Sequence, residues 1–319
     1  MIGVDLQARY RERLSSLPKP GYGLCFHTKS LGVADLGVTA GLSPEQIVAD
    51  LHQAAQGGKR REPDSQIINT VRRALADHGD GRFVPVPRPK PIIRNGAAVL
   101  RKLIGQGRGV TEADMRKASP VPIDGKDDTV LALQNLYGEN DRIFVGERYN
   151  EGMMGATIRT CAEWIEHFRG GGKPGPHIIV NPLTGAPAPK KSDREKMTYR
   201  GDGNVAAYRF CVVEFDGLSR EDQIAFWSVA DLPVCALVDS GRRSLHAWLS
   251  VPRLAPVSTD EEWDKHIQDE LYHQILVPMG VDGSCSNSAR LSRLPGHLRD
   301  TGRMQRLLYL APEGRRIFS

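Results

Sequence analysis

The sequence predicts an α+β protein in which a small helical domain precedes a larger domain, built on a mixed, partly antiparallel sheet with flanking helices. Three observations support this fold class. Helix signals dominate residues 1–80, alternating prolines then interrupt the chain, and short apolar strands mixed with helices fill the rest. A chain of 319 residues is long enough for one large and one small domain.

The N-terminal domain, residues 1–80, carries two helix signals. In "GLSPEQIVADLHQAAQGG", Ser43 can cap a helix that has Pro44 at its first position. Gln46 completes a capping box, and Gly57 follows the helix end. A second helix is expected from about Asp64, with apolar residues at helical spacing at Ile67, Ile68, Val71 and Leu75. Because both helices are short, we expect them to pack with a preceding helix as a small bundle.

A proline-rich segment separates the two domains. In "GRFVPVPRPKPIIRNG", prolines alternate with other residues, a pattern that excludes a helix or a central strand. We therefore expect a linker over residues 81–95 and a larger domain over residues 96–319.

The larger domain begins with helix signals and two short strands. Helices are expected near residues 96–104, 112–118, 126–137 and 161–169. The apolar runs "RIFVG" (142–146) and "HIIVN" (177–181) are typical of buried strands.

The second half of this domain is richer in strands. A helix capped by Ser219 is expected after the first of them, and a longer helix begins at Thr259. The long helix has one apolar stripe, formed by Trp263, Ile267, Leu271 and Ile275. Strands are expected over residues 205–216, 234–239, 244–251 and 306–310.

Positive charge is concentrated in two segments, although the net charge of the chain is only +5. Residues 82–117 hold nine Lys or Arg against two acids, and residues 286–319 hold seven Arg against two acids. Contact with phosphate groups is one explanation for these segments. A solvated linker and a solvated tail are the other.

Cysteine usage and hydropathy exclude several classes of protein. The five cysteines are scattered and lack zinc-binding spacing. The N-terminus lacks the apolar region of a signal peptide, and no apolar run approaches the roughly 20 residues of a membrane helix. We expect no membrane partner and a reducing, bacterial-type cytoplasm.

Two carboxylates follow the expected strand in "RFCVVEFDGLS". Side chains alternate along a strand, so Glu214 and Asp216 share a face with Phe210 and Val212. They would lie roughly 6.6 Å apart along the strand, and a hard divalent ion such as Mg²⁺ would relieve their repulsion. A strand end with two solvated acids is the alternative.

A second polar face is expected in "CALVDSGRRSLHAWLSV", which reads as two strands joined by a turn. Alternation puts Ser244, His246 and Trp248 together, opposite an apolar face. With Arg242 and Arg243 nearby, the hydroxyl and imidazole are suited to binding phosphate oxygens. A surface histidine beside a structural tryptophan is the alternative.

A third acid precedes two arginines in "GVDGSCSNSARLSRLPGHLRD". Arg290 and Arg293 are spaced so that a helix would put both on one side, and guanidinium groups match phosphate geometry. Together with Asp282, they suit a site that holds metal ions and a triphosphate.

These motifs, in this order, resemble the archaeo-eukaryotic primase superfamily, in particular the primase-polymerases of phages, plasmids and integrated elements. The residues that carry the resemblance are "VVEFDG" (212–217), "SGRRSLHAWL" (240–249) and "VDGSCSNSARLSRLPG" (281–296), within a matching region of roughly 110–311. The resemblance implies a core with an RRM-like sheet and flanking helices.

The resemblance also implies roles for the residues of each motif. Glu214, Asp216 and Asp282 would bind two Mg²⁺ or Mn²⁺ ions. Ser244 and His246 would contact the phosphates of the incoming nucleotide, and the basic residues Arg243, Arg290 and Arg293 would assist them. Many relatives have Asp where this chain has Glu214, so the longer side chain shifts the metal and can favour Mn²⁺.

The implied activity is template-dependent nucleotidyl transfer by a DNA primase or polymerase, acting on a single-stranded DNA template with NTP or dNTP. Two metal ions support such chemistry without a side-chain nucleophile. The chain has no Walker-type loop, so a helicase partner would be a separate protein. A metal-dependent nuclease and a non-catalytic replication initiator or single-stranded-DNA-binding protein remain as alternatives.

The N-terminal domain resembles the small helical (PriCT-like) domain that follows many such primases, here placed before the core. It could contact DNA through the basic residues Lys59, Arg60, Arg61, Arg72 and Arg73. A packing domain with solvated basic turns is the alternative.

Overall fold

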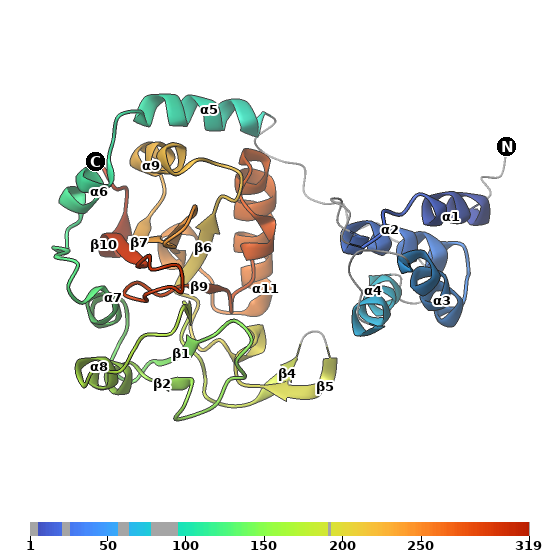
Figure 1. Cartoon of the computed structure of the whole chain (residues 1–319), viewed down its shortest axis with the longest axis horizontal. Helices are drawn as coiled ribbons and strands as arrows, with labels where there is room; N and C mark the ends of the chain where they lie inside the picture. Colours follow the sequence, from blue (N-terminus) through green and yellow to red (C-terminus); the bar gives the residue numbers. More distant parts are fainter. Residues whose placement is uncertain (1–5, 21–25, 57–63, 78–94, 191–192, 319) are drawn as a thin grey trace. The chain divides into compact units, whose positions relative to one another are not determined.

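The chain divides into two compact units, Met1–Arg88 and Pro89–Ser319 (Figure 1). The computed structural model describes residues 6–20, 26–56, 64–77, 95–190 and 193–318. Nearly all of the expected linker, residues 81–95, lies outside these ranges, and so does Gly57. The proline-rich linker therefore stays a prediction.

The N-terminal unit contains four helices within its described residues: α1 (Leu6–Ser15), α2 (Phe26–Thr39), α3 (Pro44–Ala55) and α4 (Asp64–Asp77). The Ser43 side chain accepts a hydrogen bond from the Gln46 backbone N–H at 3.2 Å, which confirms the expected cap of α3. Apolar side chains from all four helices form one core, which includes Tyr10, Val33, Ile47, Leu51, Ile67 and Val71. Ile68, on the other side of α4, is exposed.

Helices and antiparallel sheets alternate in the larger unit, which confirms the α+β class. Its helices are α5 (Gly96–Gly107), α6 (Glu112–Ala118), α7 (Asp128–Leu136), α8 (Cys161–Arg169), α9 (Arg220–Val229), α10 (Val251–Leu254) and α11 (Asp260–Glu262). The long helix expected from Thr259 begins as α11 and continues as a π-helix, η3 (Trp263–Leu276). Short 3₁₀ turns are η2 (Asp202–Asn204), η4 (Val277–Met279) and η5 (Gly283–Cys285).

The main sheet has the strand order β10-β7-β8-β6, with every neighbouring pair antiparallel. Its strands are β6 (Phe210–Glu214), β7 (Val234–Asp239), β8 (Leu245–Ser250) and β10 (Arg306–Arg315). The expected strand over 205–216 was too long, because pairing with β8 covers only Phe210–Glu214. Asp216 therefore lies beyond the end of β6.

The RRM-like sheet order is not confirmed. In a β-α-β-β-α-β sheet of that type, the last strand lies beside the first. Here β10 pairs with β7, at the opposite edge from β6.

A second sheet has the order β2-β1-β3-β9, and a separate hairpin joins β4 to β5. The strands are β1 (Arg142–Gly146), β2 (Ile158–Thr160), β3 (His177–Ile179), β4 (Ala188–Lys190), β5 (Asp193–Thr198) and β9 (Leu291–Arg293). The helical interpretation of residues 290–293 was wrong, because this segment leads into and forms β9. Antiparallel pairing with β3 sets Arg293 opposite His177.

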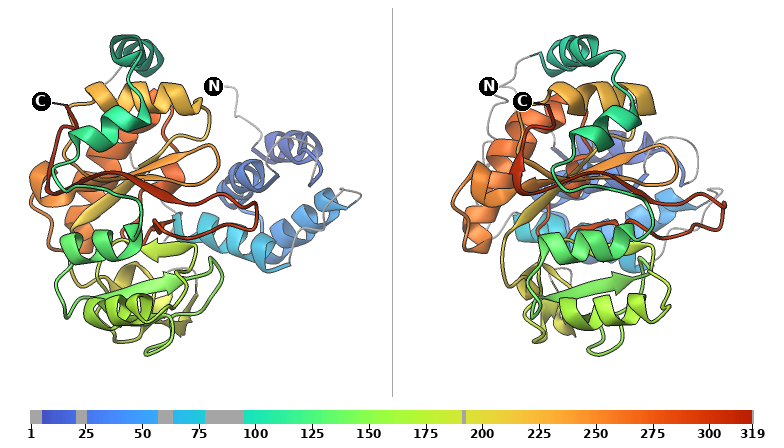
Figure 2. Two further views of the ribbon diagram at one scale, coloured as in Figure 1. Left: turned by 60° about the vertical axis from the view of Figure 1, so that its left-hand side comes forward. Right: turned by 90° about the vertical axis from the view of Figure 1, so that its left-hand side faces the viewer.

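The two faces of the main sheet bury different sets of side chains. One face packs Val213, Ala247 and Leu249 against α5, α9 and η3, while the other packs Val212 and Trp248 against α7, α8 and β1. Figure 2 shows the sheet between these two layers. The expected alternation along β6 and β8 is confirmed, and it directs Glu214 and His246 to the face that carries Val212 and Trp248.

No helix among the described residues is long and apolar enough to cross a membrane.

Candidate functional site

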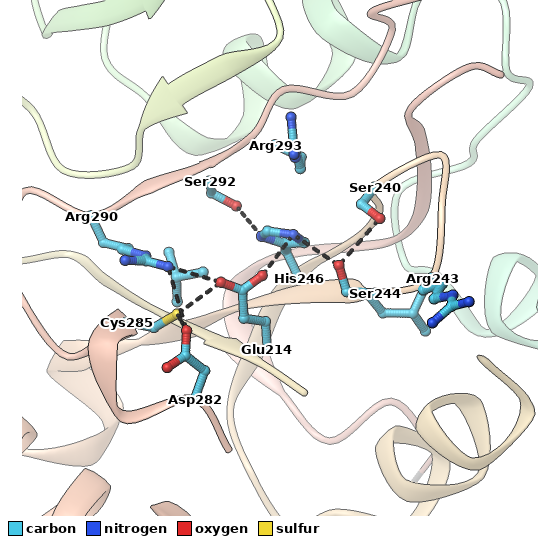
Figure 3. A network of polar contacts seen from close by, with 12 residues as sticks. Glu214, Ser240, Arg243, Ser244, His246, Asp282, Cys285, Arg290, Ser292 and Arg293 are labelled. Carbon is cyan, nitrogen blue, oxygen red and sulfur yellow. Dashed lines mark hydrogen bonds and ion pairs between the residues drawn. The ribbon is translucent and has the colours of Figure 1, made fainter. Parts of the chain in front are cut away.

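Three segments that are distant in sequence meet at the end of β6. Glu214 is the last residue of β6, and His246 lies opposite it on β8. The Asp282 backbone N–H donates a hydrogen bond to the Glu214 carbonyl oxygen at 3.1 Å, which joins the start of η5 to the same strand end. Arg290, just before β9, points toward these side chains (Figure 3). The fold thus brings residues of all three sequence motifs together.

Both oxygens of the buried Glu214 carboxylate are engaged. Its Oε2 atom lies 3.0 Å from His246 Nε2, and its Oε1 atom accepts from Arg290 Nη2 at 2.9 Å and from Cys285 Sγ at 2.8 Å. Burial raises the pKa of Glu214, but the neighbouring His246, Cys285 and Arg290 lower it more, so its pKa lies below the ordinary value. Glu214 is therefore an ionised carboxylate with Arg290 as its counter-charge.

His246 is neutral in this site, because burial lowers its pKa to about 4 despite the Glu214 carboxylate. The polar network assigns its tautomer. Nδ1 accepts from the Ser292 hydroxyl at 3.3 Å, and Ser292 Oγ itself accepts from Trp248 Nε1 at 2.7 Å. Nε2–H then faces Glu214, with Ser244 Oγ at 3.4 Å. Trp248 and Ser292 thus fix the imidazole that Glu214 contacts.

Asp282 joins Glu214 in one compact donor group. Its carboxylate accepts from the Ser284 backbone N–H at 2.9 Å and from the Ser284 hydroxyl at 2.6 Å. One donor atom each of Glu214, Asp282 and Cys285 lies within 4.8 Å of the other two. Burial raises the pKa of Cys285, with Glu214 adding to the effect, so the sulfur is a thiol here.

Asp216 is less closely placed than the sequence suggested. It is exposed beyond β6 and does not belong to the compact donor group, although it lines a cavity together with Glu214. Partial desolvation raises the pKa of Asp216, and the charges of Glu214 and Asp282 add to this. Its proposed role as a metal ligand stays a prediction.

The donor group fits a divalent cation. Two carboxylates and a sulfur converge, and Arg290 Nη2, at 2.9 Å from Glu214 and 3.9 Å from Asp282, already provides positive charge at the same place. Carboxylate oxygens suit Mg²⁺ and Mn²⁺, whereas a sulfur ligand suits softer ions. An ion bound here would compete with the Arg290 guanidinium for the Glu214 carboxylate.

The turn between β7 and β8 carries Arg242, Arg243 and Ser244 and is held by polar side chains. The fully buried Gln223 of α9 donates to the Arg243 carbonyl at 3.0 Å and accepts from the Leu245 N–H at 2.7 Å. Gly241 has φ +69°, a left-handed conformation that is strained for any residue with a side chain. Its α-carbon is also close to the Arg299 side chain, so a Cβ would lie 3.0 Å from Arg299 Cδ.

A cavity of about 980 Å³ is lined by Glu214, His246 and Arg290, while Asp282 and Cys285 lie outside its lining. Eight arginines or lysines line it, against four carboxylates. The cations are Arg148, Lys190, Arg200, Arg242, Arg243, Arg290, Arg293 and Arg299, and the acids are Glu151, Asp202, Glu214 and Asp216. This excess of positive charge favours an anionic ligand.

Arg293 and Arg290 do not share one partner, because Arg290 precedes β9 and Arg293 lies in it, so they are not on one side of a helix. Arg293 Nη1 donates to His177 Nε2 at 2.9 Å. Burial, and then Arg293, lower the pKa of His177 to about 4, so His177 is a neutral acceptor. Burial, and then Arg299, lower the pKa of Arg293 itself. Like charges are therefore gathered on this wall of the cavity.

Sequence reasoning missed several residues of the site. Cys285 and Ser292 lie inside the third sequence motif but were not predicted as site residues. Cys285 is three residues after Asp282. His177 and Arg148 come from segments with no acidic or phosphate-binding pattern of their own, and Arg299 belongs to the basic segment 286–319 without having been assigned to the site. Only the pairing of β9 with β3 and the turn before β10 bring His177 and Arg299 to the cavity.

The basic residues expected to contact DNA in the N-terminal unit stay a prediction. Lys59, Arg60 and Arg61 lie outside the described residues. Arg72 is exposed on α4, and Arg73 lies on the same helix.

No protein-family model and no curated protein matches this sequence. Among solved structures, the chain is similar to the AEP domain of the primase-polymerase (PrimPol) of cyanophage S-2L. The likeness has a TM-score of 0.36 and 15% identity, and it covers 60% of this chain and 94% of that domain. A likeness at this level does not establish a common fold.

Proposed function

We propose that this protein is a metal-dependent nucleotidyltransferase that extends a nucleic-acid strand on a single-stranded template, as a DNA primase or polymerase does. The observation that carries the proposal is a cavity lined by an excess of arginines and by Glu214, which also belongs to the donor group with Asp282 and Cys285. A triphosphate and its metal ions need both kinds of group at once. The order of the sequence motifs supports the same conclusion.

Glu214 and Asp282 would hold a divalent ion, and Cys285 would be a further ligand once its thiol has lost its proton. Asp216 lines the same cavity as Glu214 and would contribute to a second ion. Bound Mg²⁺ or Mn²⁺ would supply charge neutralisation at the reacting phosphate and activation of the attacking hydroxyl. Arg290 balances the Glu214 charge when the ion is absent and is free to turn to a phosphate when an ion replaces it. Glu214 thus has a cationic partner in either case.

The phosphate groups have several donors available on the other walls. Arg293 and Arg299 are close enough to influence each other, and neither forms an ion pair with a carboxylate among the described residues. Ser244 Oγ lies 3.2 Å from Ser240 Oγ, so two hydroxyls are adjacent at the same turn. These donors would orient a triphosphate for attack at its α-phosphorus.

Nucleotidyl transfer fits the site better than hydrolysis of nucleic acid by a general base. A nuclease of that kind needs an imidazole or carboxylate that can accept a proton from water. His246 is buried, and its Nε2–H faces Glu214, while Glu214 is occupied by Arg290 and Cys285. Neither group is available as a base in this arrangement.

A non-catalytic nucleotide- or strand-binding protein is the second candidate, and one observation favours it. Arg290 neutralises the Glu214 carboxylate without any metal, so the site is electrostatically complete as it stands. Such a protein would bind nucleotides and single strands without joining them.

Primer extension separates these candidates. The full chain is incubated with a primed single-stranded template, dNTPs or NTPs, and Mg²⁺ or Mn²⁺. We expect extension by the wild type and its loss in Glu214→Gln with Asp282→Asn, while the exposed Glu166→Gln on α8 retains it. Template degradation without extension would support the nuclease, and binding without either reaction would support the non-catalytic protein.

A further inference from the structure

Exposed apolar side chains are concentrated on segments that also line the cavity, and one of them, Tyr149, lines it directly. Of the eight large apolar side chains that are exposed in the described residues, six lie on three segments that contribute to the cavity wall. These segments are the loop 147–157, strand β5 and the loop 297–305, and the side chains are Tyr149, Met153, Met154, Met197, Leu298 and Met304. Such a concentration marks an interaction surface. We call these six side chains the apolar rim.

Tyr149 is the most exposed member of the apolar rim, at 87%, yet the turn that carries it is held by two hydrogen bonds. The Arg200 guanidinium donates to the carbonyl oxygens on both sides of Tyr149, to Arg148 at 2.9 Å and to Asn150 at 2.6 Å. Arg200 is itself stacked 4.6 Å from the centroid of the Phe144 ring. The solvent-exposed Tyr149 ring is therefore carried by a turn whose backbone is hydrogen-bonded to Arg200.

Positive charge is interleaved with the apolar rim. The Arg148 guanidinium lies 5.7 Å from the Tyr149 ring centroid and forms no ion pair within the described residues. Arg242 and Arg243 are exposed on another side of the same cavity. The acidic neighbour Glu151 is paired with Lys190 at 3.5 Å. The flat Tyr149 ring next to the Arg148 guanidinium matches a base and a phosphate of a single strand.

We propose that the apolar rim and Arg148 bind the single-stranded nucleic acid, with a base stacked on Tyr149 and a phosphate held by Arg148. That this strand is the template rests on the proposed function. A strand fits better than one nucleotide, because the apolar rim extends over three segments and offers contacts to several bases. The interleaved cations favour a polyanion over an apolar protein partner.

Fluorescence anisotropy of a labelled oligo(dT) of about 20 nucleotides tests this surface on the full chain, in EDTA and without nucleotide. We expect Tyr149→Ala to weaken binding by about tenfold, because one stacked base contributes roughly that factor. Tyr149→Trp should keep the affinity, and so should Val99→Ala, an exposed apolar control on α5 that does not line the cavity. Arg148→Gln should lower the slope of log affinity against log salt by about one.

Unchanged oligo(dT) affinity in Tyr149→Ala would overturn the proposal, as would a loss confined to the binding of free dTTP. Thermal unfolding of each variant checks that the exposed substitutions leave the fold intact. Because the binding assay needs no metal or catalysis, it tests the strand-binding surface independently of the proposed transferase activity. If Tyr149→Ala loses binding but the wild type does not extend the primer, the transferase proposal is wrong. If Tyr149→Ala binds oligo(dT) normally while the wild type extends the primer, the proposed strand-binding surface is wrong.

Discussion

Glu214 and His246 face each other across β6 and β8, with Glu214 Oε2 3.0 Å from His246 Nε2. The imidazole is neutral, so this contact is a hydrogen bond from Nε2–H and not an ion pair. The charge of Glu214 is balanced by Arg290 instead, at 2.9 Å. The histidine therefore positions the carboxylate, while the arginine and a metal ion compete for it.

Stability should fall as the pH falls from about 6.5 to about 4. His246 and His177 each have an ordinary pKa of 6.5 that the fold lowers to about 4. The unfolded chain binds these protons first, so the stabilisation is complete above the unfolded pKa and is lost toward the folded one. Each histidine contributes a slope of up to about 1.4 kcal/mol per pH unit. Urea unfolding across this range measures it, and His246→Gln should flatten the curve. An equally steep curve in that variant would contradict the assignment.

Arg290→Met should lower the free energy of unfolding by about 3 kcal/mol, because it leaves a largely buried carboxylate without its cation. A divalent ion should restore that loss. We therefore expect Mn²⁺ to raise the melting temperature of Arg290→Met more than that of the wild type.

Arg220→Met is the matched control for the loss of an arginine pair. Arg220 contacts Asp239 at 2.7 Å, away from the donor group of Glu214, Asp282 and Cys285. This variant should lose stability without gaining a response to Mn²⁺. An equal response in both variants would mean that Arg290 does not occupy a metal site.

Cys285→Ala should weaken Mn²⁺ binding by about tenfold and Mg²⁺ binding less, because sulfur is the softer ligand. Isothermal titration with each metal ion measures the difference. Cys211→Ala removes another buried thiol, which lies on the face of β6 opposite Glu214, and it should leave the affinities for both metal ions unchanged. If Cys285→Ala binds both ions like the wild type, the thiol is only a structural neighbour.

Ser292→Ala should cost about 1–3 kcal/mol of stability, because it leaves Trp248 Nε1 and His246 Nδ1 without their buried partner. Its effect on extension should appear in kcat, with the KM for nucleotide nearly unchanged, since Ser292 acts through His246. Chemical unfolding and steady-state kinetics give the two readouts. A rise in KM alone would place Ser292 in the nucleotide contact instead.

Arg299→Gln should raise the KM for nucleotide by about tenfold, because a charge-assisted phosphate contact is lost. Arg299 is anchored by its bond to the Ser240 carbonyl at 3.0 Å and lies beside the Arg293 charge. The exposed Arg253→Gln on α10 controls for the change in net charge. Steady-state kinetics at varied nucleotide concentration measure the KM of both variants. If Arg299→Gln has the same KM as Arg253→Gln, Arg299 does not contact the phosphates.

Local patterns in the sequence predicted the elements that hold the site. The caps at Ser43 and Ser219 were predicted from residue type, because the hydroxyl bonds an N–H only a few residues away. The face that Glu214 shares with Val212 and the face that His246 shares with Trp248 were predicted for the same kind of reason, since side-chain alternation is a property of each strand. That both faces lie on the same side of the sheet follows from the pairing of β6 with β8. The residue at which β6 ends was not predicted, because it depends on how far the pairing with β8 extends.

The sequence by itself therefore determined the α+β class, the helix caps and the faces on which Glu214 and His246 lie. Only the tertiary structure decided that Arg290 contacts Glu214 while Arg293 contacts His177, that Cys285 joins the donor group and that Asp216 lies outside it. The reason is physical: periodicity is set by neighbours along the chain. The partners of Arg293 and Cys285 are set by packing between segments that lie 116 and 71 residues apart.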